Sequence, residues 1–392
     1  RWARFFTMQP RFSPAMTDNK RRRGNRGGKR KRQRQAAGPF GQNQAPITAF
    51  RVERRPSSEA EVEQEVETAD PVDDNSPEEA PTISEMDAAY FEAYDRLDVH
   101  TLMLNDSQRL GSYLAAIRAH NLQGKLVLDV GAGSGILSML AAKHGLAEHV
   151  WAVEAVPGMA QLALDLVQQN GLQEKVTVIQ GRVEEVELPS KVDVIISEWM
   201  GFYLVHESML ESVLHARDRL LQPQGLMLPC RARIWAALVE SEDLRKEVAG
   251  YEDFLGLDLR MVGEQQLMAR TAEPQIEEIN ARRLLAPPVL AMDLGDLHHL
   301  PLEGTRELQA QVCFRTWRSG FVAGIAFWFD ASFGHEVILK TDPGSPTTHW
   351  KQTVVYLGQF PAIEAGDVLE AQVTMKQSDA NPRQYSISVE TL

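Results

Sequence analysis

Two glutamates stand nine residues apart in the middle of the chain, and both adjoin segments that could position a charged ligand. Glu198 follows an apolar run in SEWMG, and Glu207 precedes a predicted helix in HESML. Two converging carboxylates repel each other unless a cation lies between them or one is protonated. A guanidinium suits this place because its planar fork binds carboxylates with paired hydrogen bonds. Taken alone, Glu207 is better explained as a carboxylate favoured by a helix dipole.

A glycine-rich turn further upstream could bring backbone close to a ligand. The run Leu126–Val130 leads directly into GAGSG at 131–135 and then into a predicted helix. Glycines allow the sharp strand-to-helix turn that binds ligands at a helix N-terminus. The next strand ends in Glu154, which can accept hydrogen bonds from both hydroxyls of a ribose. Because the G-x-G-x-G spacing differs from the dinucleotide fingerprint, we predict a nucleoside ligand; the alternative is a tight turn with a structural carboxylate.

The elements that must position these residues alternate between strand and helix up to Pro229. We predict strands at Leu126–Val130, Val150–Glu154, Lys175–Gln180, Val192–Ser197 and Leu226–Leu228, and helices at Ile136–His144, Pro157–Asn170 and Ser208–Leu221. This alternation predicts an α/β fold with a doubly wound, Rossmann-like parallel sheet. Such folds bind ligands at the carboxyl edge of the sheet, where Glu154 and Glu198 fall.

The pattern changes after Cys230 to short alternating apolar segments, which are typical of an antiparallel sheet. These segments are Leu308–Trp317, Gly320–Phe329, Thr353–Leu357 and Val368–Met375. We therefore predict two domains, at 84–229 and 230–392, preceded by a disordered tail at 1–83.

The tail is basic and then acidic. Residues 1–55 contain sixteen Lys or Arg and two acidic residues, whereas 59–79 contain ten acidic residues and no Lys or Arg. The runs at 20–23 and 29–32 indicate nuclear import or polyanion binding, with a solvated tail as an equal alternative. Since the whole chain has a net charge of −13, the remaining part is strongly acidic. An acidic body suits cationic substrates and argues against sequence-specific binding of nucleic acid.

Composition excludes other classes of protein. Only two cysteines are present, Cys230 and Cys313, with no neighbouring ligands for a structural zinc ion, so we predict no metal. No apolar run is long enough to cross a membrane, and no signal-peptide core is visible at the N-terminus. We expect a soluble protein that is not secreted and has no membrane partner.

Taken together, these motifs resemble those of the protein arginine N-methyltransferase family, type I. SEWMG with HESML matches the family's double-glutamate loop, and LDVGAGSGILS (128–138) its first methyltransferase motif. YFEAY (90–94) matches the helix that folds over the cofactor, while VEEVELP (183–189) and THWKQT (348–353) match two further motifs. The resemblance implies S-adenosylmethionine as the cofactor and a β-barrel-like second domain. It also implies transfer of methyl groups to arginine in other proteins, with mono- and asymmetric dimethylarginine as products.

The resemblance implies a role for each matching position. Glu198 and Glu207 would bind the substrate guanidinium, and a His349–Asp106 pair would close the site and accept a proton. The residues expected to bind the cofactor are His100, Met103, Arg109, Asp129, Gly131, Gly133, Glu154, Val183 and Glu184. Among these, Arg109 would bind the cofactor's carboxylate, Glu154 its ribose, and Val183 with Glu184 its adenine. The residues expected to bind the substrate are Tyr90, Tyr94, Met209 and Trp350.

The resemblance also concerns partners. Ser241–Met268, with GLDL at 256–259, looks like the helical arm by which family members bind a second subunit, so a homodimer is expected. We expect arginine-containing protein substrates, either histones or Arg/Gly-rich proteins. The expected location is the nucleus, with the cytoplasm as a further possibility.

Two other functions compete with this one. A dinucleotide oxidoreductase on the same sheet is disfavoured by the glycine spacing and the glutamate pair. A scaffold that binds arginine-rich partners without catalysis would also explain the acidic body. Single residues have ordinary explanations too, since Arg109 could be a surface charge, Met103 a core filler and His349 a loop cap.

Overall fold

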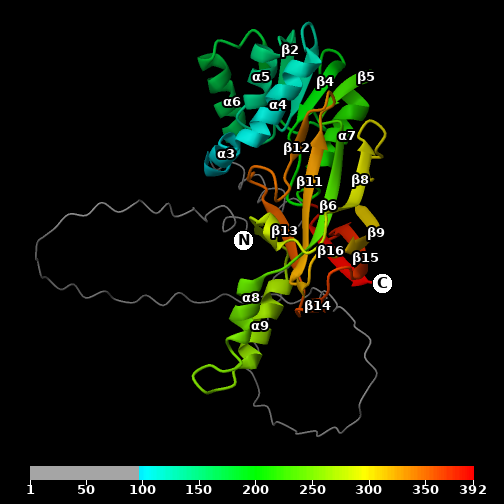
Figure 1. Ribbon diagram of the computed structural model, residues 1–392. Helices are drawn as coiled ribbons and strands as arrows, with labels where there is room; N and C mark the ends of the chain where they lie inside the picture. Colours follow the sequence, from blue (N-terminus) through cyan, green and yellow to red (C-terminus); the bar gives the residue numbers. More distant parts are fainter. Residues whose placement is uncertain (1–96) are drawn as a thin grey trace, which may run out of the picture. The chain divides into compact units, whose positions relative to one another are not determined.

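A five-stranded parallel sheet forms the first part of the fold (Figure 1). The computed structural model describes residues 97–392, so Tyr90, Tyr94 and the charged tail lie outside the described residues. The strand order is β3-β2-β1-β4-β5. The bounds are β1 (Leu126–Val130), β2 (His149–Glu154), β3 (Val176–Gln180), β4 (Val192–Ser197) and β5 (Leu221–Leu228). The central strands are rich in Val, Ile and Leu, as expected for a parallel sheet covered on both faces.

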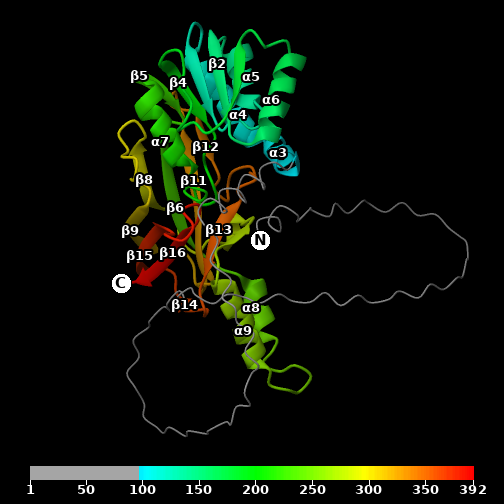
Figure 2. The same ribbon diagram turned by 180° about the vertical axis from the view of Figure 1, so that it is seen from behind.

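Helices cover both faces of this sheet (Figures 1 and 2). The connections from β1 to β3 run through α5 (Ile136–His144) and α6 (Pro157–Gln169), whereas α7 (Met209–Leu220) connects β4 to β5 in the opposite direction. Because parallel crossovers are right-handed, opposite directions place the helices on opposite faces. Two helices precede the sheet, α3 (Leu97–Leu104) and α4 (Ser107–His120), and α4 packs against α5.

The register of the strands brings the chemically interesting segments to one edge. Val130, the last residue of β1, is paired with Val153 on one side and Ser197 on the other. The glycine turn therefore leaves the sheet between Glu154, the last residue of β2, and Glu198, which directly follows β4. The strand order reverses direction at β1, and ligands bind at such switch points.

Residues 230–391 form an antiparallel domain. One sheet has the order β7-β13-β11-β6-β8 with β12 beside β11, a second has the order β16-β15-β9, and β10 pairs with β14. The bounds are β6 (Arg231–Val239), β7 (Gln275–Glu277), η1 (Ala281–Arg283), β8 (Val289–Asp296), β9 (Glu307–Arg315), β10 (Gly320–Phe321), β11 (Gly324–Ser332), β12 (Ile338–Lys340), β13 (Gln352–Tyr356), β14 (Ala362–Ile363), β15 (Val368–Gln377) and β16 (Tyr385–Thr391). Contacts between β8 and β9 join the two larger sheets around an apolar core. The predicted fold class, a doubly wound sheet followed by an antiparallel barrel-like domain, is confirmed.

An arm of two helices extends from this domain between β6 and β7 (Figure 1). The helices α8 (Glu242–Ala249) and α9 (Arg260–Thr271) pack against each other. The turn between them is not helical, because Leu255 and Gly256 both have positive φ. Several apolar side chains of the arm are exposed to solvent, including Leu255 at 91% and Met261 at 72%. The arm predicted at Ser241–Met268 is thus two helices and a turn, ending at Thr271.

The sequence prediction was wrong about the start of β5. The strand begins at Leu221 and not at Leu226. The prediction was too short because Pro223 and Gly225 made the residues before Leu226 resemble a loop. The structure accommodates both residues in an irregularity of the pairing with β4, between the Val192 and Val194 positions.

Two further predictions need correction. Gly320–Phe329 is not one strand, because Val322 and Ala323 separate β10 from β11. The backbone N–H of Val322 donates to the carbonyl of Pro361, and that of Ala323 donates to the carbonyl of Val239. The helix predicted from Ser208 begins one residue later, since Ser208 has a φ of 55°. Among residues 97–392, no helix is long and apolar enough to cross a membrane.

Candidate active site

A buried ion pair joins Arg109 in α4 to Glu198, which directly follows β4. Arg109 Nε donates to Glu198 Oε2 at 2.9 Å, and Arg109 Nη1 donates to the carbonyl of Met103 at 3.2 Å. The two side chains are only 7% and 9% exposed. Within residues 97–392, neither Arg109 Nη2 nor Glu198 Oε1 has a hydrogen-bond partner. The pair therefore presents one open donor, suited to an anion, and one open acceptor, suited to a cation.

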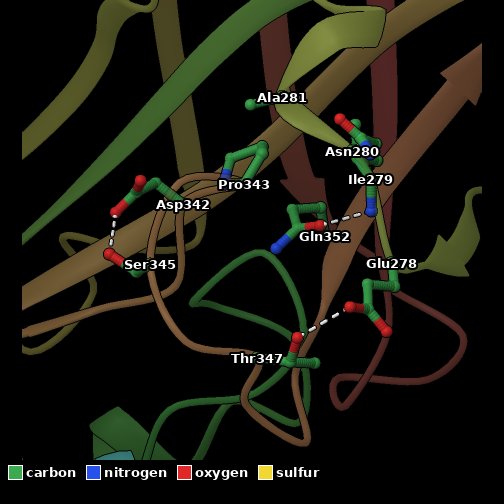
Figure 3. Close-up of a pocket in the computed structure, with 9 residues that line it drawn as sticks. All are labelled: Glu278, Ile279, Asn280, Ala281, Asp342, Pro343, Ser345, Thr347 and Gln352. Carbon is green, nitrogen blue, oxygen red and sulfur yellow. Dashed lines mark hydrogen bonds between the residues drawn. The ribbon is translucent and has the colours of Figure 1, made fainter.

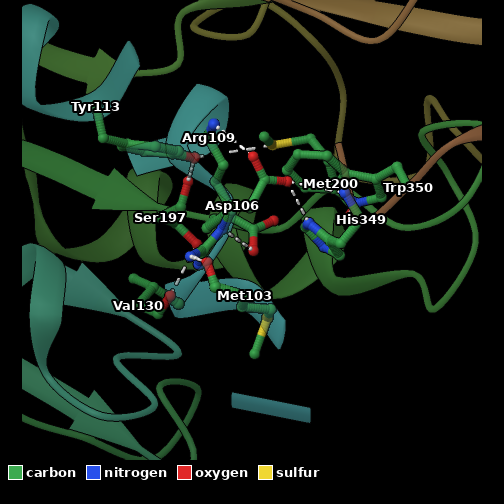
Figure 4. A network of polar contacts seen from close by, with 10 residues as sticks. Met103, Asp106, Arg109, Tyr113, Val130, Ser197, Met200, His349 and Trp350 are labelled. Carbon is green, nitrogen blue, oxygen red and sulfur yellow. Dashed lines mark hydrogen bonds and ion pairs between the residues drawn. The ribbon is translucent and has the colours of Figure 1, made fainter. Parts of the chain in front are cut away.

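The backbone on either side of Glu198 is held by three hydrogen bonds (Figure 4). Tyr113 Oη donates to the carbonyl of Ser197 at 2.8 Å, and Ser197 Oγ donates to the carbonyl of Val130 at 2.8 Å. Trp350 Nε1 donates to the carbonyl of Met200 at 2.7 Å. Neither Tyr113 nor Ser197 was predicted as a site residue, since Tyr113 lies in a segment with no predicted element and Ser197 was marked only as the last residue of a strand.

Asp106 connects α4 to the segment that carries His349 (Figure 4). Its Oδ1 accepts the backbone N–H of Arg109 at 2.9 Å and caps the helix, while Oδ2 accepts His349 N at 2.9 Å and Nδ1 at 2.8 Å. Burial by itself would raise the pKa of Asp106, but the hydrogen bonds from His349 and Arg109 lower it overall. An ionised Asp106 fixes the proton on Nδ1 and leaves Nε2 as the acceptor.

The loop between the two glutamates forms a hairpin. Gly201 and Leu204 exchange two backbone hydrogen bonds of 3.0 Å. A Cβ atom at Gly201 would lie 1.9 Å from the carbonyl oxygen of His206, so glycine is required here. Tyr203 Oη bonds to His206 Nδ1 at 2.7 Å, and burial lowers the pKa of His206 to about 4. The hairpin ends at Glu207, which is 8% exposed.

The glycine turn is tied to the acid at the end of β2. Gly133 N donates to Glu154 Oε2 at 2.7 Å, and Val156 N donates to Oε1 at 2.8 Å. Burial raises the pKa of Glu154. Gly131 has a φ of 70°, and a Cβ atom on it would lie 2.1 Å from Met209 Cε. Met209, which was predicted to bind the substrate, therefore packs against the glycine turn.

Asp129, two residues before this turn, has an unusual carboxylate. Oδ2 accepts the hydroxyl of Ser138 at 2.7 Å, while Oδ1 is buried and has no hydrogen-bond partner among the described residues. Burial raises its pKa from 3.8 to about 6. An unsatisfied buried acceptor is costly, so this oxygen is suited to a ligand that donates a hydrogen bond.

The remaining predicted cofactor residues lie around the same edge. His100 is buried, and its Cε1 would be 3.2 Å from a Cβ atom on Gly133. Val183 is also buried, and Glu184 Oε1 accepts the hydroxyl of Ser212 at 2.5 Å. Tyr90 and Tyr94 are outside the described residues, so the structure does not place them.

A separate cavity lies in the antiparallel domain (Figure 3). It has a volume of about 410 Å³ and is lined by Glu278, Ile279, Asn280, Ala281, Asp342, Pro343, Ser345, Thr347 and Gln352. Its carboxylates are hydrogen-bonded within the wall, Glu278 to Thr347 at 2.7 Å and Asp342 to Ser345 at 2.6 Å. None of the predicted active-site residues lines this cavity, so it is distinct from the candidate site.

Comparison with known proteins agrees with this geometry. A profile described as a methyltransferase domain matches residues 127–225, and one described as the arginine methyltransferase oligomerization subdomain matches 230–391. Protein arginine N-methyltransferase 6 of Xenopus tropicalis is 40% identical over 318 residues, which cover 78% of this chain and 91% of that protein. The chain belongs to the protein arginine N-methyltransferase family. Protein arginine N-methyltransferase 1 of Schizosaccharomyces pombe is 37% identical, over 76% of this chain and 88% of its own length.

Solved structures of protein arginine methyltransferases have the same fold. A Trypanosoma brucei protein arginine methyltransferase 1 enzyme–prozyme heterotetrameric complex with AdoHcy matches with a TM-score of 0.69 and 33% identity, covering 76% of this chain and 94% of that chain. Protein arginine methyltransferase 10 of Arabidopsis thaliana matches with a TM-score of 0.68 and 32% identity, covering 77% and 94%. This chain is accordingly a protein arginine N-methyltransferase, and the oxidoreductase alternative is excluded.

Proposed function

We propose that this chain transfers methyl groups from S-adenosylmethionine to arginine side chains of other proteins, giving mono- and asymmetric dimethylarginine. The observation that carries the proposal is the Arg109–Glu198 pair, in which Nε and Oε2 are 2.9 Å apart while Nη2 stays an open donor and Oε1 an open acceptor. Such an enzyme needs both groups side by side, because its cofactor ends in a carboxylate and its substrate is a cation.

The residues at the sheet edge fit this cofactor. Arg109 Nη2 would bind the carboxylate of the cofactor, and Glu154 would accept the ribose hydroxyls while keeping its bonds to the glycine turn. The unsatisfied Oδ1 of Asp129 lies at the same strand end. Val183 and Glu184 would border the adenine. When bound, S-adenosylmethionine supplies an electrophilic methyl group.

The two glutamates would prepare the arginine for attack. A protonated guanidinium is a poor nucleophile, because its electron pairs are delocalised over the whole fork. Carboxylates on one edge draw the positive charge toward that edge and leave more electron density on the remaining nitrogen. Glu198 can offer Oε1 without releasing Arg109, so the same residue can hold the substrate while its position stays fixed. Positioning of this kind accounts for a large part of enzymatic rate enhancement.

The His349–Asp106 pair would accept the proton that the guanidinium loses. Asp106 holds the proton of His349 on Nδ1, so Nε2 is the available base. The ionised aspartate also stabilises the imidazolium that would form.

The proposed product is asymmetric dimethylarginine, and the proposed partners are a second subunit and cationic protein substrates. Met103 and Met209 are unbranched, which leaves room for a second methyl group on the same nitrogen and supports a type I product. The exposed apolar side chains of the arm, together with the oligomerization subdomain profile, support a homodimer. The acidic body supports cationic substrates such as histones or Arg/Gly-rich proteins. The basic runs at 20–23 and 29–32 support a nuclear location.

The test is mass spectrometry of an Arg/Gly-rich peptide after incubation with purified protein and methyl-labelled S-adenosylmethionine. We expect labelled monomethylarginine and asymmetric dimethylarginine. Symmetric dimethylarginine alone would contradict the type I proposal, and peptide binding without label would favour the non-catalytic scaffold.

A further inference from the structure

The turn that contains Glu207 has a backbone conformation that residues other than glycine rarely adopt. Glu207 has a φ of 76° and Ser208 a φ of 55°, and neither is a glycine. Residues with a Cβ atom persist in this left-handed region only where surrounding contacts hold them there. The contacts that hold this turn therefore set the position of the Glu207 backbone, from which its carboxylate extends.

Both backbone polar groups of Glu207 bond to one residue of the C-terminal hairpin. Glu207 N donates to the carbonyl of Arg383 at 2.8 Å, and Arg383 Nη1 donates to the carbonyl of Glu207 at 3.1 Å. A hydrogen bond from a charged donor is stronger than one between neutral groups. Arg383 thus binds the turn through its backbone and its side chain together.

The next residue of the turn is held by the same hairpin. The hydroxyl of Ser208 donates to the carbonyl of Pro382. Gln377 Nε2 donates to Ser208 Oγ at 3.0 Å and to the carbonyl of Pro382 at 2.8 Å. Two consecutive residues in the left-handed region are therefore bonded to two neighbouring hairpin residues.

The hairpin is itself well fixed. Its strands β15 and β16 are in register up to the Gln377–Tyr385 pair, and the loop 378–384 lies between them. Within the loop, Ser378 N donates to Gln384 O at 2.9 Å, and Arg383 N donates to Asn381 Oδ1 at 3.1 Å. An element with such internal bonding can hold another segment in a strained conformation.

We propose that Arg383 is a positioning residue for Glu207, and that the C-terminal hairpin loop acts as a clasp on the turn. The inference deepens the proposed function, in which Glu207 binds the substrate guanidinium. Arg383 acts through the backbone of Glu207. Its loss should disturb substrate use and leave the cofactor residues of β1 and β2 in place.

The test compares three variants with the wild type. Arg383→Met removes the side-chain donor, Arg383→Lys restores a charged donor, and Arg306→Met is the matched control. Arg306 also reaches from the antiparallel domain to α7, where its Nε contacts Glu211 at 2.9 Å, but it does not contact the Glu207 turn. Gln377→Met is a second, independent way of weakening the clasp if Arg383→Met fails to fold.

Two measurements are made on each purified full-length variant. Hydrogen–deuterium exchange of the peptide spanning 201–209 reports whether the turn has loosened, and it needs no activity. Methylation kinetics on an Arg/Gly-rich peptide, with calorimetry for S-adenosylmethionine, report the consequence. We expect faster exchange and a loss of about tenfold to a hundredfold in kcat/KM in Arg383→Met, with cofactor affinity unchanged. Arg383→Lys should recover most of this loss, and Arg306→Met should match the wild type.

The outcomes separate the clasp from the proposed function. Unchanged exchange at 201–209 in Arg383→Met and Gln377→Met overturns the clasp. Wild-type kcat/KM with faster exchange overturns the positioning role, as does an equal loss in Arg306→Met. If the wild type methylates no arginine, the proposed function fails, and the exchange data still decide whether Arg383 holds the turn.

Discussion

Arg109 Nε lies 2.9 Å from Glu198 Oε2, and this contact joins a residue expected on the cofactor side of the site to one expected on the substrate side. Both side chains are buried, so removing either charge leaves the other without its partner in a poorly solvated place. In the proposed function, binding of the cofactor and binding of the substrate are thus connected through this ion pair. Loss of the Glu198 charge therefore affects Arg109 as well, whereas loss of the Glu207 charge does not affect this ion pair.

Glu198→Gln and Glu207→Gln should both reduce turnover, by roughly 10²- to 10³-fold, because each removes a charge that binds the guanidinium. Only Glu198→Gln also leaves Arg109 without its ion-pair partner, so this variant should have a lower melting temperature than Glu207→Gln. The measurements are labelled-methyl kinetics and thermal unfolding. Glu211→Gln is the control, since the carboxylate of Glu211 in α7 contacts the exposed Arg306, which directly precedes β9. Near-normal turnover in Glu198→Gln or Glu207→Gln would show that this glutamate is not needed for methyl transfer.

Glu154→Ala should weaken S-adenosylmethionine binding by roughly tenfold to a hundredfold, because it removes acceptors for the ribose and leaves buried N–H groups unpaired. Those groups are the backbone N–H of Gly133 and Val156. Isothermal calorimetry measures the affinity directly. Glu148→Ala is a suitable control, since Glu148 is exposed just before the opposite end of β2. Equal affinity in the two variants would make Glu154 a structural residue only.

Asp129 should make stability depend on pH in the absence of cofactor. Its pKa is raised from 3.8 to about 6 in the folded protein, so between these values the folded state binds more protons than the unfolded state. The unfolding free energy therefore falls as pH rises through this window, by on the order of 3 kcal/mol. Asp129→Asn removes this cost and keeps an acceptor for Ser138. Denaturant unfolding of both proteins from about pH 4 to 7 should show the variant gaining relative stability as pH rises. A constant difference would refute the ionisation.

The arm should be required for self-association. Leu255→Glu with Met261→Glu places charges on two of its most exposed apolar side chains, and these would be desolvated in an interface. We expect the wild type to be dimeric and the double variant monomeric in light scattering after gel filtration. Leu392→Glu changes a leucine outside the arm that is 66% exposed, and this variant should stay dimeric. A monomeric wild type would contradict the proposed homodimer.

Much of the first domain was predictable from local pattern. The strands Leu126–Val130 and Val192–Ser197 and the helix Ile136–His144 have the predicted bounds. Their apolar periodicity depends only on neighbouring residues, which is why a single sequence displays it. Parallel strands end at a common edge, so the placement of Glu154 and Glu198 at that edge followed from the same pattern. Where Pro223 and Gly225 imitated a loop, the prediction of β5 was too short, because pairing with β4 outweighed local preference.

The partners of the functional side chains were decided by tertiary structure alone. Arg109 and Glu198 are 89 residues apart, and Glu207 and the Arg383 side chain that bonds it are 176 apart. Tyr113 looked like any core residue until its hydroxyl was seen to hold the carbonyl of Ser197. The sequence determined which residue types reach the sheet edge, because strand and helix periods are local. Which oxygen of Glu198 stays open depends on how α4 packs beside β4. What holds Glu207 in a left-handed turn depends on how the antiparallel domain packs against the parallel sheet. Neither packing leaves a periodic trace in the chain.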